Sequence, residues 1–167
     1  EFVHKAGKIF RWFKVKPTVI GAKLELKEPK FKTRGPNFGL FSALDDDRHP
    51  RVIMANVAYP LNVSRLEGVS ELGKAVASCG AHLFVPTGTV MPTPNREDLQ
   101  YDKASRPVLV AALQEVAQAV AQEIYDRVKA EECSTWEWRK RIREYANSLP
   151  DTLKFKIKDL LALAQVP

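Results

Sequence analysis

Two compact apolar runs with an amphipathic segment between them set the strongest constraint on how this chain folds. The runs cover residues 51–58 and 81–85, and each has the length and composition of a buried strand. The segment between them, 64–79, carries apolar residues at helical spacing, and Gly80 suits a helix C-terminus. Strand, helix and strand joined this closely form a βαβ unit with parallel strands. We therefore expect an α/β (or α+β) fold with a small sheet around this unit.

Further helices are expected after the βαβ unit. Ser64 with Glu67, and Ser134 with Glu137, match the capping box that begins many helices. Apolar residues then recur every three or four positions along the C-terminal half, although residues 153–158 also alternate as a strand would. We favour a helix there. The expected helices are 64–79, 107–131, 135–148 and 151–164.

Positive charge is concentrated near the N-terminus. Residues 1–36 hold ten of the 26 basic residues but three of the 20 acidic ones, so their net charge is +7. Residues 37–167 hold 16 basic and 17 acidic side chains, a net charge of −1. This asymmetry points to an acidic partner, which could be nucleic acid, anionic lipid or an acidic protein surface. We expect an extended basic arm over residues 1–44 and one globular domain over 45–167.

The arm is also rich in aromatic residues, since residues 1–44 hold seven of the chain's fifteen. A solvated disordered tail would have few of them, so we expect the arm to pack on something. Residues 22–27 alternate apolar and charged side chains like a half-buried strand. Pro17, Pro29 and Pro36 favour extended backbone before them. The arm therefore has the features of a docking element.

The densest basic-aromatic cluster is Arg11-Trp12-Phe13-Lys14. Basic side chains neutralise phosphates and aromatic rings stack on unpaired bases, which favours RNA. Packing on a neighbouring protein, with lysine stems along apolar surface, explains the same residues equally well. A second basic cluster lies in the expected helix 135–148, where a solvated helix face is the favoured interpretation. The candidate RNA- or partner-binding residues are Lys5, Lys8, Arg11, Trp12, Phe13, Lys14, Lys16, Lys30, Lys32, Arg34, Arg139, Lys140 and Arg143.

Other patterns that could carry chemistry have simpler structural explanations. The carboxylates of residues 45–47 precede His49, but adjacent side chains in extended backbone point in different directions, so we expect a solvated turn or a salt partner for the basic arm and not a metal site. Residues 87–89 are expected to form a turn that leaves the sheet. Cys79 and His82 are close in sequence, yet one ends a helix and the other enters a strand. We predict no catalytic residue, no metal ligand and no cofactor.

These observations favour a non-catalytic structural subunit of a large assembly, such as a mitochondrial ribosome, whose arm docks on rRNA or neighbouring protein subunits. An accessory subunit of a respiratory or ATP-synthase complex is one alternative, with the arm along protein and lipid headgroups at the matrix side. A small α/β enzyme with a site near 86–90 is another. The apolar runs are far shorter than the roughly 20 residues that cross a bilayer. The two cysteines fit a reducing compartment, and the initial Glu1 fits removal of a targeting peptide.

Overall fold

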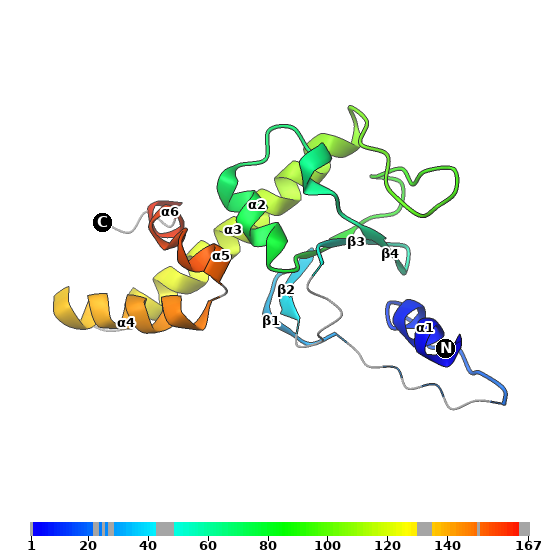
Figure 1. Ribbon diagram of the computed structural model, residues 1–167, viewed down its shortest axis with the longest axis horizontal. Coiled ribbons are helices and arrows are strands. Elements are labelled where there is room, and N and C mark those ends of the chain that lie inside the picture. Colours follow the sequence, from blue (N-terminus) through cyan, green and yellow to red (C-terminus); the bar gives the residue numbers. More distant parts are fainter. Residues whose placement is uncertain are drawn as a thin grey trace.

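The computed structural model describes residues 2–21, 24, 26, 29–42, 49–129, 135–149 and 151–163, and a five-stranded sheet lies at its centre (Figure 1). The strands are β1 (Phe31–Arg34), β2 (Phe38–Ser42), β3 (Arg51–Met54), β4 (Val57–Pro60) and β5 (His82–Val85). The helices are α1 (Phe2–Phe10), the 3₁₀ turn η2 (Val63–Arg65), α2 (Glu71–Ser78), α3 (Ser105–Lys129), α4 (Thr135–Ser148), α5 (Asp151–Lys154) and α6 (Ile157–Leu163).

The sheet contains the expected parallel pair. Its strand order is β1-β2-β5-β3-β4, and β3 pairs with β5 in parallel, with Arg51 beside His82 and Met54 beside Val85. The other neighbouring strands are antiparallel. The fold is therefore a mixed α/β fold with C-terminal helices, as the sequence predicts. Residues 31–42, from the segment that we assigned to the arm, supply β1 and β2.

The first apolar run is not one strand but a hairpin, so the expectation of a single strand over 51–58 was wrong. Met54 pairs with Val57 across a two-residue turn. The turn residues Ala55 and Asn56 have φ angles of 49° and 70°. Two successive positive φ angles define the type I′ turn, whose twist matches that of antiparallel strands. The connection from β3 to β5 therefore contains both β4 and α2.

The helix predicted at 64–79 begins later than expected, at Glu71. Ser70 provides its N-cap, because the Ser70 Oγ accepts a hydrogen bond of 3.0 Å from the Gly73 amide. Gly68, with a φ of +82°, separates this helix from η2. The carboxylate of Glu67, predicted to complete a capping box with Ser64, instead lies 3.3 Å from the Arg106 guanidinium. Gly80, with a φ of +80°, terminates α2 as predicted.

The long helix α3 spans residues 105–129 and begins two residues earlier than predicted, while residues 130 and 131 of the predicted helix lie outside the described residues. Asp102 explains its early start, since one carboxylate oxygen accepts bonds of 2.7 and 3.2 Å from the Ser105 and Ala104 amides. The hydrogen bonds with Ser105 hold the pKa of this carboxyl below its usual value. Helix α4 matches the predicted 135–148. The last predicted helix is divided into α5 and α6, while Ser134 lies outside the described residues.

The main core lies between the sheet and the C-terminal helices. Leu40, Val52 and Leu83 project from β2, β3 and β5 into this core and are fully buried. The opposite wall is the apolar stripe of α3, whose members lie at the predicted spacing and are also fully buried: Leu109, Leu113, Val116, Val120 and Ile124. Helices α2 and α3 lie on this side of the sheet, whereas α1 lies on the other (Figure 1). The N-terminal segment thus faces the side that the C-terminal helices leave uncovered.

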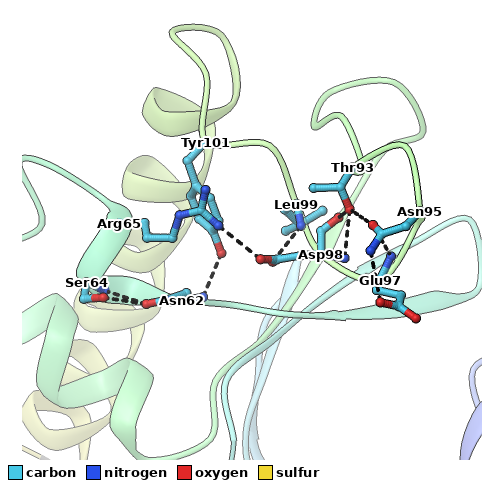
Figure 2. A network of polar contacts seen from close by, with 9 residues as sticks. All are labelled: Asn62, Ser64, Arg65, Thr93, Asn95, Glu97, Asp98, Leu99 and Tyr101. Carbon is cyan, nitrogen blue, oxygen red and sulfur yellow. Dashed lines mark hydrogen bonds and ion pairs between the residues drawn. The ribbon is translucent and has the colours of Figure 1, made fainter.

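Polar contacts hold the long connection between β5 and α3 in place (Figure 2). The Tyr101 hydroxyl accepts a 2.7 Å hydrogen bond from the Asn62 amide, and the Arg65 guanidinium lies 4.6 Å from the centre of the Tyr101 ring. Arg65 also forms a 3.1 Å ion pair with Asp98. At the tip, the Thr93 hydroxyl donates to the Asn95 side chain. The contacts of Tyr101 and Asp98 attach this connection to Asn62 and Arg65, at the two ends of η2.

Candidate nucleic-acid interface

An aromatic layer covers the face of β5 that points away from the helices. His82 and Phe84 alternate with the core residue Leu83, so both side chains lie on that face. The Trp12 ring centre lies 5.4 Å from that of His82 and 6.4 Å from that of Phe84. The Phe31 ring centre lies 5.2 Å and 6.1 Å from the same two rings. We call these four residues the aromatic layer, and their contacts attach the N-terminal segment to the sheet.

Two features hold the aromatic layer in position. The fully buried His82 ring has its Nδ1 atom 2.9 Å from the Gly80 carbonyl oxygen, and since a carbonyl only accepts, Nδ1 carries the proton. Gly39 lies beside His82 in the sheet register. A Cβ atom added to Gly39 would lie 2.5 Å from the Phe31 ring, far inside normal contact distance. Glycine at position 39 therefore gives the Phe31 ring room to lie against the sheet.

Basic side chains surround one edge of this layer. A cavity of about 260 Å³ there is lined by four cations and four aromatic rings, and none of the described residues that line it is acidic. The Lys16 ammonium, at the cavity wall, donates a 2.8 Å hydrogen bond to the Arg11 carbonyl oxygen. The cavity thus combines positive charge with flat apolar surface. Its lining residues are Arg11, Trp12, Phe13, Lys14, Lys16, Pro29, Phe31, Arg34 and Phe84.

A second, smaller cavity lies between α1 and the β3–β4 hairpin. Its volume is about 160 Å³, and Arg11 and Trp12 line both cavities. Lys8 and Arg51 add two more cations, and the described lining includes no carboxylate. The Arg51 Nε atom is buried and has no hydrogen-bond acceptor among the described residues. A buried donor left in this state costs about 1–3 kcal/mol, which an anionic ligand would offset.

We call the residues of these two cavities together the basic-aromatic surface. It brings together seven of the predicted binding residues: Lys8, Arg11, Trp12, Phe13, Lys14, Lys16 and Arg34. Arg51 is an addition that the sequence did not indicate, because a basic residue at the start of a strand usually marks only the solvated strand end. The predicted residues Lys5, Lys30 and Lys32 are exposed and line neither cavity.

The three predicted residues of α4 lie on a separate, solvated helix face. Arg139, Lys140 and Arg143 are all exposed, and Trp136 beside them is 70% exposed. The Lys140 ammonium lies 5.8 Å from the Trp136 ring centre and 4.0 Å from a Glu144 carboxylate oxygen. The other face of α4 packs Trp138, Ile142 and Tyr145 against the core, and Leu149, which follows the helix, is also buried there. We call Trp136, Arg139, Lys140 and Arg143 the α4 stripe.

The structure describes the surroundings of Cys79, of His82 and of the turn after β5, the residues that the alternative chemical sites would use. The Cys79 thiol lies 3.1 Å from the Thr152 hydroxyl, and burial raises its pKa, which disfavours the reactive thiolate. His82 is instead part of the aromatic layer. Residues 86–89 form a turn in which the Thr89 amide donates to the Pro86 carbonyl. Within the described ranges no cluster of metal-ligating side chains occurs, and residues 45–47 lie outside those ranges.

No protein-family model, curated protein or solved structure matches this chain. Among the helices that the structure describes, none is both long enough and apolar enough to cross a bilayer. The basic-aromatic surface is therefore interpreted from its own chemistry.

Proposed function

We propose that this protein is a non-catalytic structural subunit of a large RNA-containing assembly, with an organellar ribosome as the first candidate, and that it docks on RNA through the basic-aromatic surface. The observation that carries the proposal is the larger cavity, where four cations and four aromatic rings meet with no acidic residue in the described lining. Cations bind phosphates and aromatic faces stack on unpaired bases, so this combination suits single-stranded RNA.

The distribution of charge supports the same proposal. The chain carries a net charge of +6, while residues 37–167 carry −1, so the excess positive charge belongs to the segment that forms most of the basic-aromatic surface. Residues 37–167 are near neutral only in total, and their surface is available for contacts with neighbouring subunits.

The proposal is tested by removing three charges that line only the larger cavity. We expect Lys14→Gln, Lys16→Gln and Arg34→Gln, combined in one variant, to weaken binding to a short single-stranded RNA. If each cation neutralises one phosphate, the slope of log affinity against log salt falls by about 2. Fluorescence anisotropy over a salt series measures this slope. Whole-segment deletion is a poorer test, because removing residues 1–36 also removes β1.

The α4 stripe supplies the matched control for this experiment. Arg139→Gln, Lys140→Gln and Arg143→Gln remove the same total charge from a solvated helix face. This variant should keep a slope close to that of the unmodified protein. Equal slopes for all three proteins would contradict RNA docking at the basic-aromatic surface, and equal losses in both variants would indicate non-specific charge attraction.

An accessory subunit of a membrane-bound respiratory or ATP-synthase complex is the second candidate. The observation that favours it is the exposure of apolar residues directly after α1, where Val15 is 84% and Ile20 is 98% exposed. Such residues suit packing on a protein or on lipid. Native purification separates the candidates, since co-migration with rRNA supports the ribosomal proposal and co-migration with an RNA-free membrane complex supports this one.

A further inference from the structure

The smaller cavity contains the cationic side chain of Arg51, and no carboxylate of a described residue lines this cavity. Arg51 begins β3 and lies between Pro60 of β4 and His82 of β5 in the sheet register. Its side chain is half-buried, and its Nε atom is shut off from solvent without an acceptor among the described residues. A guanidinium in this position favours an anion that brings its own acceptor atoms.

The lining of the cavity limits what that anion can be. Lys8, Arg11 and Arg51 converge on a volume of about 160 Å³, with only Ile9, Trp12, Val57 and Ala58 between them among the described residues. That volume has room for several water molecules, and so it suits a compact group such as a phosphate. Planar guanidinium groups bind phosphate oxygens with paired hydrogen bonds, and the lysine adds a point charge.

The position of the cavity indicates where the phosphate belongs. Arg11 and Trp12 line both cavities, so the smaller cavity adjoins the wider one in which bases could stack. We propose that the cavity between α1 and the β3–β4 hairpin binds one backbone phosphate of the single-stranded RNA, with Arg51 as its principal ligand. This inference rests on the proposed RNA docking and specifies the point at which the strand is anchored.

Two variants of the full chain test this inference. Arg51→Met keeps the apolar stem and removes the charge, while Ala58→Leu keeps every charge and fills space in the cavity wall. We expect Arg51→Met to weaken binding of a short single-stranded RNA about tenfold, the loss typical of one charge-assisted contact. The salt slope should fall by about 0.7, as for one phosphate on a single strand. Ala58→Leu should weaken binding without removing a charge.

Lys158→Met provides the control, because Lys158 is an exposed residue of α6, far from α1 (Figure 1). It removes one positive charge as Arg51→Met does, and RNA affinity should stay within about twofold of the unmodified protein. Thermal melting of each variant establishes that it is folded. Melting is also measured in inorganic phosphate and in chloride at matched ionic strength. Phosphate should raise the melting temperature of the unmodified protein relative to chloride, but not that of Arg51→Met.

The outcomes separate this inference from the proposed function. If Arg51→Met and Ala58→Leu bind RNA with unchanged affinity and salt slope, the phosphate anchor is wrong although RNA docking stands. If the unmodified protein binds no RNA but is stabilised by inorganic phosphate through Arg51, the proposed function is wrong and the cavity takes a free phosphate compound. RNA binding weakened by both variants and not by Lys158→Met supports the anchor.

Discussion

The molecule presents two basic surfaces with an accessible tryptophan, and they differ in what lies beneath the charge. On the basic-aromatic surface, Trp12 packs on His82 and Phe84, and its cations line two cavities. On the α4 stripe, Trp136 is 70% exposed, and its cations extend from a helix face into solvent. The two surfaces have a similar local composition. Only the basic-aromatic surface forms cavities, because residues of the sheet pack against the N-terminal segment there.

The tryptophan pair provides the largest expected difference. Trp12→Ala removes the ring that connects the N-terminal segment to β5. Because the Trp12 side chain is only half-buried, we expect a loss of about 2–3 kcal/mol of unfolding free energy, near the lower end of the range for truncating a large core side chain. Trp136→Ala should change stability by less than about 0.5 kcal/mol, because its ring is mostly solvated. Urea denaturation measures both values. Equal costs would mean that Trp12 does not contribute to the fold as its contacts indicate.

Gly39 tests how tightly the aromatic layer is packed. Gly39→Ala should lower the unfolding free energy by about 1–2 kcal/mol, since the new methyl group would overlap the Phe31 ring. Phe31→Ala removes the obstruction, so the double variant should lose less than the sum of the two single losses. Denaturation of the four proteins completes this cycle. Strict additivity would show that Phe31 does not rest on Gly39.

Much of the fold follows from local patterns in the sequence. The spacing of apolar residues in α3 reflects burial of one helix face, and the apolar runs before and after α2 reflect buried strands. Both patterns can be read from the sequence alone. The hairpin at residues 55–56 was missed because Ala-Asn lacks the glycine that usually marks a type I′ turn. The start of α2 was misplaced because Ser64 was predicted as its N-cap, whereas Ser70 caps the helix and Gly68, with a positive φ angle, lies between Ser64 and the helix.

The candidate site was predictable only in part. Arg11-Trp12-Phe13-Lys14 was identified from composition, and all four residues do line the larger cavity. The aromatic layer depends on contacts between Trp12 and Phe84 across more than seventy positions of sequence, and no local pattern encodes such a contact. Arg51 was missed for the same reason, because its environment exists only when α1 lies against the hairpin. Arg51 could be identified as a candidate ligand only once the structure showed that α1 packs beside the β3–β4 hairpin.

A pair of lysines gives the smallest and most direct test of the difference between the two surfaces. Lys16 is half-buried and donates to the Arg11 carbonyl oxygen at 2.8 Å, whereas the exposed Lys140 lies 4.0 Å from Glu144. Lys16→Met should therefore cost about 1 kcal/mol of unfolding free energy, the usual net value of one intramolecular hydrogen bond. Lys140→Met should cost less than about 0.5 kcal/mol, as for other exposed ion pairs one helical turn apart.

Raising the salt concentration sharpens this last comparison. The contribution of the Lys140–Glu144 pair is electrostatic and solvated, so salt should reduce it to nothing measurable. The Lys16 bond is partly shielded from solvent and should keep most of its contribution. Chemical denaturation of both variants at low and high salt measures the two responses. A salt-sensitive cost at Lys16 equal to that at Lys140 would place both lysines on ordinary solvated surfaces and remove the structural distinction between the basic-aromatic surface and the α4 stripe.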